Sequence, residues 1–418
     1  MGPDNLPEKE YLTLDELDVE GKTVLLRVDI NSPLDRSTLE LASLTRIRSI
    51  EPTLRRLLER RARVVILAHQ GRKGDWDFCS LEKHATAIRR EIGIPVAFVP
   101  DLMGERAKEA IKGLKPGAAL MLENVRGWEG ETAKKTPEEH ARSELVTALA
   151  PMADFFVNDA FAAAHRSQAS LVGFPMVLPS AAGLLLDAEV TAMTKVFRSP
   201  RRPFTVVLGG AKFYDATTLI SHLLDTGTAD RVLLTGLVPM PFLRAEGRSL
   251  GGPMEEVVAR EPEAVGAAGE ILKKHRERVF LPHGFAMDDG GKRRELGLEE
   301  LPVERPLLDI SSHTAERFAE LVRASGTVFV SGPAGLFEKP PFDLGTTILL
   351  RAIADSGAYR VAGGGHTTSA IERLGLRQRF DYISTGGGAL EEFILGKTLP
   401  GLEALRLAKE RWKGRRGG

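Results

Sequence analysis

Short apolar runs rich in β-branched residues recur along the chain, and each is followed by glycine or polar residues and then by a stretch with helical periodicity. Clear examples are TVLLRVDI at 23–30, RVVILAHQ at 63–70, FTVVLGG at 204–210 and TVFVSG at 327–332. Runs that are apolar on both faces are typical of central strands in a parallel sheet. Alternating strands and helices predict an α/β fold with helices on both faces of each sheet.

The same pattern places the remaining elements. Further strands are expected at 95–100, 118–124, 154–160, 231–236, 278–282, 359–365 and 381–388. Helices are expected at 46–61, 81–92, 137–150, 214–224, 314–324 and 389–396. Thr136, Pro137 and Glu139 form a capping-box pattern at the start of one helix. We expect a surface excursion at 245–265 and a loop at 286–306 because both stretches are rich in polar residues and glycine.

The strands and helices fall into two similar halves. A chain of 418 residues is long enough for two domains of this kind. The stretch 176–203 lies between the halves and contains an expected helix at 186–197. We therefore expect two Rossmann-like domains, each with a mostly parallel sheet flanked by helices, at 1–180 and 201–399. An inter-domain helix and hinge at 181–200 would join them.

Composition excludes several classes of protein. The 57 basic residues balance 57 acidic ones, which argues against a protein that coats nucleic acid, and 6% aromatics argue against stacking platforms for single strands. The single cysteine, Cys79, excludes an intrachain disulfide and a cysteine-based zinc site. No apolar run approaches the ~18 residues of a membrane span, and the start MGPDNLPEKEYL does not have the pattern of a signal peptide. We expect a cytoplasmic protein without nucleic-acid or membrane partners.

Ligands of open parallel sheets bind beyond the carboxyl ends of the strands. In the first half, mainly cationic and amide side chains follow the expected strands: Asp29, Asn31, His69, Arg72, Arg126, Asp159, His165 and Arg166. Guanidinium groups bind phosphate with two parallel hydrogen bonds. One such arginine is usually a surface ion pair, but basic residues at several strand ends indicate a site for a small, multiply charged anion such as a phosphorylated acid.

In the second half, glycine follows the expected strands. The segments are 209–212, 235–236, 331–333, 363–366 and 386–388. Glycine lets the backbone approach a phosphate closely, and helix N-termini offer unpaired N–H groups to it. This half suits a nucleotide polyphosphate, so the two halves together point to phosphoryl transfer. No GxxxxGK[ST] motif of P-loop proteins occurs. No GxGxxG follows a strand either, and this second absence weighs against the alternative of an NAD-dependent dehydrogenase.

Several long motifs resemble those of the phosphoglycerate kinase family in the same order, from about Leu12 to Leu405. They include LLRVDINSPLD, LAHQGRKG, LENVRGWE, VNDAFAAAHRSQASLVGF, VLGGAK, SGPAGLFE, AGGGHT and STGGGALEEFILGKTLPGLEAL. The details DINSP, AHQG and GGGH are most similar to the archaeal branch. The resemblance implies that segment 400–418 returns to an N-terminal domain that binds 3-phosphoglycerate. It also implies reversible transfer between ATP and the carboxylate of 3-phosphoglycerate, with magnesium, in glycolysis and gluconeogenesis.

The resemblance also implies functional residues. Substrate contacts fall on Asp29, Asn31, Arg46, His69, Arg72, Arg126 and Arg166. Nucleotide contacts fall on Gly209, Gly210, Lys212, Gly236, Pro333, Glu338, Gly363, Gly364, Gly365, His366 and Thr367, of which Glu338 would bind the ribose hydroxyls. Arg46 and Lys212 are the catalytic candidates, because cations must meet the charge on the moving phosphoryl group. Gly365, Gly387 and Gly388 would donate backbone N–H groups in the transition state. The two domains are expected to close on each other during the reaction.

Two positions depart from the usual family pattern. Ala216 stands where many members have lysine, and His366 stands where many have an aspartate that helps to hold the metal. Magnesium prefers oxygen ligands, so we expect nucleotide phosphates and water to hold it and assign no protein ligand. These departures leave open a non-catalytic nucleotide- or anion-binding protein on the same fold. A monomer that uses ATP is expected, with a dimer and GTP as the alternatives.

Overall fold

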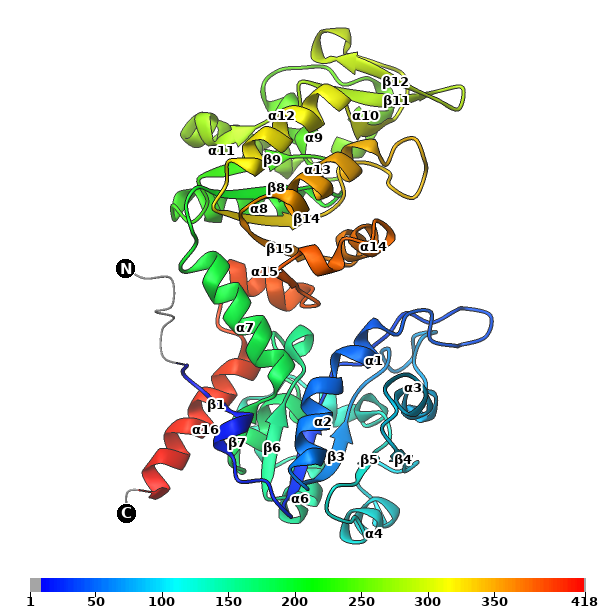
Figure 1. Cartoon of the computed structure of the whole chain (residues 1–418), viewed down its shortest axis with the longest axis vertical. Helices are drawn as coiled ribbons and strands as arrows, with labels where there is room; N and C mark the ends of the chain where they lie inside the picture. The colour runs from blue at the N-terminus through cyan, green and yellow to red at the C-terminus, as the bar shows by residue number, and fades with distance from the viewer. Residues whose placement is uncertain (1–8, 417–418) are drawn as a thin grey trace. The chain divides into compact units, whose positions relative to one another are not determined.

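The computed structural model describes residues 9–416, without the side chains of Tyr214 and residues 413–416. The first eight residues, on which the signal-peptide expectation partly rests, and the last two lie outside the described residues. The chain divides into two compact units. Figure 1 shows the chain with its helices and strands labelled where there is room. Unit 1 comprises Met1–Thr191 and Lys397–Gly418, and unit 2 comprises Ala192–Gly396.

Unit 1 is built on a parallel sheet. Among the described residues it has seven strands in the order β1-β7-β6-β2-β3-β5-β4. The strands are β1 (Leu12–Thr13), β2 (Thr23–Arg27), β3 (Arg63–Leu67), β4 (Val96–Phe98), β5 (Ala119–Met121), β6 (Phe155–Asn158) and β7 (Ser180–Ala182). β1 and β7 fall outside the runs expected to be strands, because each is very short and β7 consists only of serine and alanine.

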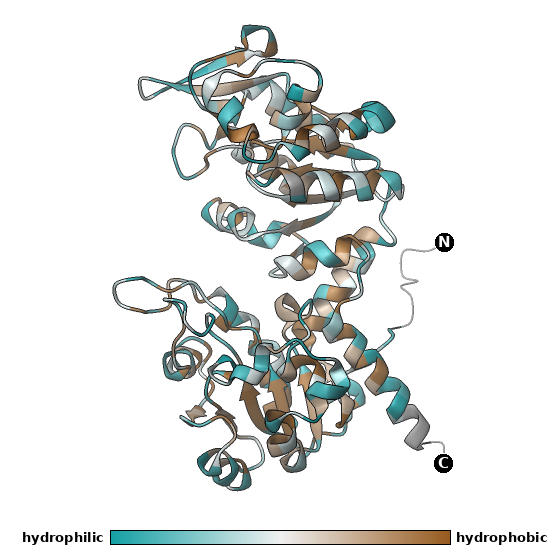
Figure 2. Cartoon of the chain, turned by 180° about the vertical axis from the view of Figure 1, so that it is seen from behind, coloured by the Kyte–Doolittle hydropathy of each residue, from teal (hydrophilic) through white to brown (hydrophobic). Residues whose placement is uncertain are grey.

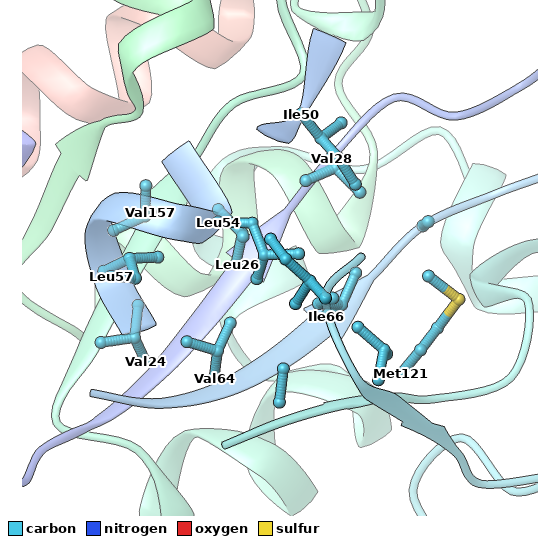
Figure 3. Packing of buried hydrophobic residues seen from close by; sticks show 14 of the residues in the cluster. Val24, Leu26, Val28, Ile50, Leu54, Leu57, Val64, Ile66, Met121 and Val157 are labelled. Carbon is cyan, nitrogen blue, oxygen red and sulfur yellow. The ribbon is translucent and has the colours of Figure 1, made fainter. Parts of the chain in front are cut away.

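Successive residues of these strands enter two different hydrophobic cores. Val24 and Leu26 of β2 belong to one buried cluster, and Leu25 between them belongs to another. Figure 3 shows the first cluster, in which Leu26, Val64 and Ile66 pack against Leu54 and Leu57. Both faces of the sheet are therefore covered, which explains why its strands read as uninterrupted apolar runs.

Helices flank the unit 1 sheet. They are α1 (Thr45–Ser49), α2 (Glu51–Glu59), α3 (Glu82–Ile92), α4 (Glu105–Lys112), α5 (Pro137–Ala141), α6 (Glu144–Leu149), the beginning of α7 (Leu184–Phe197) and α16 (Pro400–Arg416). The expected helix 46–61 is two helices that join at Ile50, and Pro52 in the first turn of α2 lacks an N–H for a continuous ladder. The expected helix 137–150 is likewise two, α5 and α6.

Two local features of unit 1 connect sequence and fold directly. The capping box is confirmed: Thr136 Oγ1 accepts from the Glu139 N–H at 3.3 Å, and Glu139 Oε2 accepts from the Thr136 N–H at 2.8 Å. The C-terminal helix α16 lies beside β1 and β7, as Figure 1 shows. Distant parts of the sequence thus complete one core.

Unit 2 is built on a second parallel sheet, with six strands among the described residues in the order β10-β9-β8-β14-β15-β16. They are β8 (Phe204–Leu208), β9 (Arg231–Leu234), β10 (Val279–Phe280), β14 (Thr327–Ser331), β15 (Tyr359–Gly363) and β16 (Tyr382–Ile383). The helices are α8 (Phe213–Asp225), α9 (Pro239–Ala245), α10 (Gly252–Val258), α11 (Glu263–His275), α12 (Ser312–Arg323), α13 (Leu344–Asp355), α14 (Gly365–Arg373) and α15 (Gly388–Ile394). Figure 2 shows apolar strands and more polar outer helices in each unit. The expected fold class is confirmed.

One expectation for unit 2 is wrong. The expected loop 286–306 largely forms a small antiparallel sheet in the order β12-β11-β13, with β11 (Gly284–Asp289), β12 (Lys292–Gly297) and β13 (Leu307–Ile310). Its polar composition reflects exposure of β12, and Gly290 and Gly291 turn the hairpin with φ of +64° and +84°. The expected excursion 245–265 contains α10 and the start of α11.

Candidate active site

The order of the unit 1 sheet reverses at β2, with β3 on one side and β6 on the other. The carboxyl ends of strands around such a switch point form a crevice for ligands. Asp29 and Asn31 follow β2, His69 and Arg72 follow β3, and Arg126 follows β5. The topology therefore brings these predicted substrate residues to one edge of the sheet.

Hydrogen bonds join the loops at this edge. Asp29 forms an ion pair of 2.5 Å with Arg46 from α1 and also accepts from the Asn31 N–H at 3.0 Å. Asn31 Oδ1 accepts from the Gly71 N–H at 2.9 Å, and Arg126 donates to the Gly71 carbonyl at 2.6 Å. Gly71 has φ of +65°, and a Cβ there would lie 2.6 Å from the backbone of Asp77. The loop that follows β3 is thus fixed from both neighbouring strands.

His69 is held by a buried arginine. Its side chain is buried, and Nδ1 lies 3.0 Å from an Nη2 of Arg27, the last residue of β2. A guanidinium group only donates, so Nδ1 must accept and the ring proton resides on Nε2. Burial, followed by the charges of Arg27, Arg126 and Arg166, holds the His69 pKa well below its usual value despite the opposing effect of Asp29. His69 is therefore a neutral donor through Nε2.

Arg27 is a residue that the sequence analysis missed. It is fully buried, and its Nε donates to Ser170 Oγ at 2.8 Å. Ser170 in turn donates from N and Oγ to the buried carboxylate of Glu131, at 2.9 and 2.6 Å. The available signal was one charged residue inside the apolar run TVLLRVDI, because a buried charge requires buried polar partners.

The remaining arginines of this edge differ in burial. Arg126 is buried; its burial, together with Arg166 and Arg27, lowers its pKa to about 10. Arg126 Nε has no hydrogen-bond partner in the described part of the chain. Arg166 is partly exposed, and its Nε donates to His165 Nε2 at 3.2 Å. Arg72 is exposed and forms no ion pair with any described residue. These cations repel one another, and a bound anion would relieve that repulsion.

The order of the unit 2 sheet reverses at β8, with β9 on one side and β14 on the other. The Gly209 N–H donates to the Ser331 carbonyl at 2.8 Å, and the Gly236 N–H donates to the Ala334 carbonyl at 3.0 Å. A Cβ at Gly209 would lie 2.2 Å from the Pro333 carbonyl oxygen. Only glycine allows this approach, so the structure brings the predicted nucleotide residues Gly209, Gly236 and Pro333 together.

Two helices begin beside these loops with glycine in unusual conformations. Gly364, before α14, has φ of +89°, and Gly387, before α15, has φ of +50°. Thr367 in the first turn of α14 accepts from the Gly332 N–H at 2.8 Å, which ties this helix to the end of β14. A Cβ at Gly363 would lie 2.6 Å from Leu390 of α15, so the two helix starts also lie near each other.

Three other predicted nucleotide residues have exposed side chains. Lys212 is 81% exposed and lies 3.8 Å from Asp215. Glu338 and His366 are exposed. Leu336, between Pro333 and Glu338, is an exposed leucine that the sequence analysis did not single out. A small recess of about 10 Å³ lies at the switch point and is lined by Thr235, Gly332, Pro333, Thr346, Thr367 and apolar neighbours.

Comparison with known proteins identifies the family. The model of the family described as Phosphoglycerate kinase matches residues 14–397. The chain belongs to the phosphoglycerate kinase family. The archaeal phosphoglycerate kinase of Methanothermus fervidus is 39% identical over 404 residues, which cover 96% of this chain and 98% of that protein. That of Methanopyrus kandleri is 41% identical over 395 residues, which cover 94% and 97%.

Solved structures agree with the sequence comparison. The crystal structure of phosphoglycerate kinase from Pyrococcus horikoshii matches with a TM-score of 0.89 and 37% identity, over 96% of this chain and 99% of that chain. The enzyme of Coxiella burnetii matches with a TM-score of 0.80 and 31% identity, over 94% and 98%. The resemblance to this family is confirmed, the chain is a kinase and hence a transferase, and the non-catalytic alternative is not favoured.

Two features are absent from the described residues: a membrane-spanning helix and a cluster of metal-binding side chains. No helix between residues 9 and 416 is long and apolar enough to cross a membrane. The same residues contain no group of three or more histidine, cysteine, aspartate or glutamate side chains that could hold a metal ion.

Proposed function

We propose that this chain transfers the γ-phosphoryl group of ATP to the carboxylate of 3-phosphoglycerate, and catalyses the reverse reaction, in glycolysis and gluconeogenesis. The products are 1,3-bisphosphoglycerate and ADP. The observation that carries the proposal is the cluster of cations at the β2–β3 edge of unit 1, where buried and exposed arginines surround a neutral histidine. Such an edge suits a small acid that carries both a phosphate and a carboxylate.

Unit 1 would bind the acid. Arg72, Arg126 and Arg166 supply charged donors for its phosphate, and His69 supplies a neutral donor from Nε2. Asn31 is held in place by Gly71 and Asp29 by Arg46, so both lie preorganised beside these donors. Segment 400–418 belongs to this substrate-binding part in our proposal, as do residues 1–180, with a hinge at 181–200.

Unit 2 would bind the nucleotide within 201–399. Gly209, Gly210 and Gly236 keep the backbone clear for it, and Pro333 and Leu336 offer apolar contacts to the base. Glu338 is an exposed carboxylate that can accept from the ribose hydroxyls. Gly363 ends β15, Gly364 precedes α14, and Gly365, His366 and Thr367 form the first turn of α14, where unpaired N–H groups favour phosphate.

The chemistry relies on charge and position. A carboxylate is ionised at neutral pH, so it attacks phosphorus without a general base. The moving phosphoryl group spreads its charge over three oxygens. We propose that Arg46 and Lys212 meet this charge and that Gly365, Gly387 and Gly388 donate N–H groups from the starts of α14 and α15. Transfer requires the acid and the γ-phosphate to come into contact.

Magnesium would enter with the nucleotide. It commonly binds one or two carboxylates together with substrate phosphates and water. Asp215, half exposed in the first turn of α8 beside Lys212, fits such a role, whereas His366 offers no oxygen ligand. Bound magnesium would neutralise phosphate charge. We further propose that the protein acts as a cytoplasmic monomer, with a dimer as the alternative.

Hydroxylamine trapping tests this function. An acyl phosphate reacts with hydroxylamine to give a hydroxamate, whereas a phosphate ester does not. We expect hydroxamate and ADP to form together, and only when ATP, magnesium and 3-phosphoglycerate are all present. ADP formation without hydroxamate would show transfer to a hydroxyl group or to water and would overturn the proposed acceptor. ADP formation with glycerate in place of 3-phosphoglycerate would overturn the role of the cationic cluster.

A further inference from the structure

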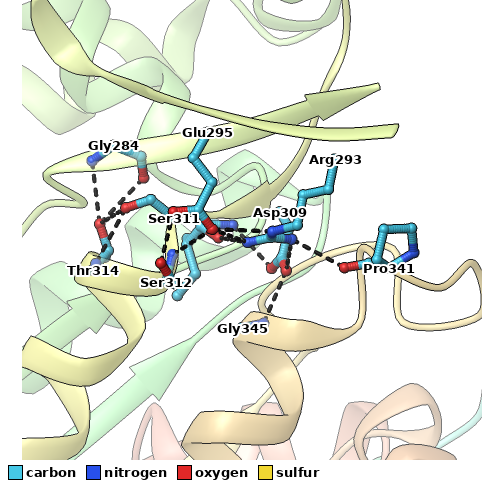
Figure 4. A network of polar contacts seen from close by, with 10 residues as sticks. Gly284, Arg293, Glu295, Asp309, Ser311, Ser312, Thr314, Pro341 and Gly345 are labelled. Carbon is cyan, nitrogen blue, oxygen red and sulfur yellow. Dashed lines mark hydrogen bonds and ion pairs between the residues drawn. The ribbon is translucent and has the colours of Figure 1, made fainter. Parts of the chain in front are cut away.

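A buried ion pair connects the small antiparallel sheet of unit 2 to the loop that follows β14. Arg293 of β12 donates from Nη1 to Asp309 Oδ2 of β13 at 2.7 Å. The Asp309 side chain has no exposed surface, and the Arg293 side chain is only 10% exposed. Figure 4 shows the pair together with Glu295, which accepts from Arg293 and from Ser312.

Two further hydrogen bonds of this pair reach residues 332–345. Asp309 Oδ2 accepts from the N–H of Gly345 at 2.9 Å, and Arg293 Nη1 donates to the Pro341 carbonyl at 3.2 Å (Figure 4). The main chain adds a bond of 2.7 Å from the Leu336 N–H to the Leu308 carbonyl. The pair therefore holds the far end of a loop whose near end carries Pro333 and Glu338.

The fit around Asp309 leaves no space for adjustment. A Cβ at Gly335 would lie 2.3 Å from Asp309 Oδ1, and a Cβ at Gly345 would lie 2.5 Å from the same oxygen. The carboxylate thus lies against both Gly335, inside the loop, and Gly345, at the start of α13. A shift of Asp309 would move the chain on either side of Leu336 and Glu338.

Stability does not explain this arrangement. Burial raises the pKa of Asp309 to about 6, which shows that the ionised form is held there at a cost. Buried ion pairs often add little to stability compared with apolar residues of similar volume. A polar pair that is bonded to two segments of one loop fixes the geometry of that loop, whatever its net effect on stability.

We propose that Arg293 and Asp309 are positioning residues for the nucleotide, which act by holding loop 332–345 where Pro333, Leu336 and Glu338 can contact it. The inference rests on the proposed nucleotide role of that loop. According to this inference, nucleotide binding also requires Arg293 and Asp309. Neither the sequence motifs nor the sheet edge indicates this, because Arg293 lies on a hairpin remote in sequence from every predicted nucleotide residue.

The test compares two neighbouring arginines. Arg293→Met removes the buried pair. Arg294→Met, on the same strand, removes an exposed ion pair with Glu300. Calorimetry of ATP and of 3-phosphoglycerate gives both dissociation constants, and steady-state kinetics give both KM values. We expect Arg293→Met to weaken ATP binding by about tenfold. This corresponds to the loss of one or two well-placed hydrogen bonds between ATP and loop 332–345. Its 3-phosphoglycerate constants and all constants of Arg294→Met should stay within about twofold.

Arg293→Lys separates positioning from folding. Lysine can keep one bond to Asp309 but cannot also reach the Pro341 and Ile310 carbonyls, so its ATP constant should lie between those of the wild type and Arg293→Met. If Arg293→Met does not fold, Arg293→Lys decides. Unchanged ATP binding, or equal weakening of both substrates, overturns the inference.

The proposed function and the positioning role of Arg293 and Asp309 can be tested separately. Wild-type protein that binds ATP but gives no turnover with 3-phosphoglycerate would contradict that function, and the ATP dissociation constants of the variants would still test the positioning role. Wild-type protein that does not bind ATP would overturn both.

Discussion

Arg46 illustrates how much of the proposed chemistry depends on single side chains. Its Nη1 is paired with Asp29, and the side chain is 28% exposed. The remaining donors face no described partner and are available to an anion. Arg46 is thus fixed in direction before any ligand binds, which suits a group that must meet charge at one moment of the reaction.

Arg46→Ala should therefore lower kcat far more than it raises either KM. Arginines that stabilise phosphoryl transfer contribute roughly 10³–10⁵-fold, and a contact made mainly in the transition state acts on kcat. Steady-state kinetics measure this. Arg48→Ala is the matched control, because Arg48 lies on the same helix, is 61% exposed and pairs with Glu91. Near-normal kcat in Arg46→Ala would remove Arg46 from the mechanism.

Arg27→Lys should disturb His69 and, through it, the binding of 3-phosphoglycerate. Lysine cannot bond to His69, Ser170 and the Val28 carbonyl simultaneously in the way that the guanidinium does. We expect KM for 3-phosphoglycerate to rise by about tenfold, with KM for ATP nearly unchanged. NMR titration should also show the His69 pKa shifting. An unchanged histidine titration together with an unchanged KM would contradict the assigned tautomer.

These residues mark the limit of what the sequence could predict about the site. Asp29, His69, Arg72 and Arg126 are predictable because strand order alone brings strand ends to one edge. The partners of Arg27 and Asp309 are not predictable. Arg27 stands out as a charge in an apolar run, but its partner Ser170 lies over a hundred residues away, and the partner of Asp309 lies on a hairpin that the sequence did not reveal.

At the scale of elements, capping makes a local prediction. Thr136→Ala removes the side-chain acceptor of the Glu139 N–H at the start of α5. Loss of such an N-cap typically destabilises by about 1 kcal/mol. Urea unfolding should show that loss for Thr136→Ala. Thr136→Ser keeps the acceptor, so it should remain close to wild type; equal losses in both variants would argue against the cap.

The start of α7 makes a prediction about pH. Asp159 is fully buried and accepts from the N–H groups of Leu185 and Leu186 at 2.9 and 3.1 Å. Burial raises its pKa to about 6, against hydrogen bonds that lower it. The folded state therefore binds this proton more tightly than the unfolded chain does. The free energy of unfolding contributed by Asp159 should fall as pH rises from about 4 to 6, by about 3 kcal/mol in total.

Asp159→Asn should remove that dependence. The stability of the variant relative to wild type should rise between pH 4.5 and pH 7.5, since only the wild type has the buried Asp159 carboxyl, which ionises in that range. Thermal unfolding at both pH values measures this, with the exposed Asp154→Asn as the control. A constant difference between variant and wild type across this range would contradict the assigned burial effect.

Element boundaries were less predictable than element types. Buried strands such as β2 and β8 were recognisable because both of their faces are apolar, whereas β12 was not, because it is exposed and polar. The division of 46–61 into α1 and α2 depends on backbone geometry around Pro52, which periodicity does not report.

At the scale of the whole molecule, side-chain cations lie at the strand ends of unit 1, and glycine-lined backbone lies at those of unit 2. Each set lies where the order of its parallel sheet reverses. The family relationship covers nearly the entire chain, so both sets are expected to serve one reaction. The central claim is that each unit binds its own substrate.

Calorimetry of two variants tests this claim most directly. Arg166→Ala should weaken 3-phosphoglycerate binding by about tenfold or more, the loss of a charged hydrogen bond, and leave ATP binding unchanged. Glu338→Ala should weaken ATP binding and leave 3-phosphoglycerate binding unchanged. If either variant weakened both ligands equally, or if each weakened the other's ligand, the assignment of one substrate to each unit would be wrong.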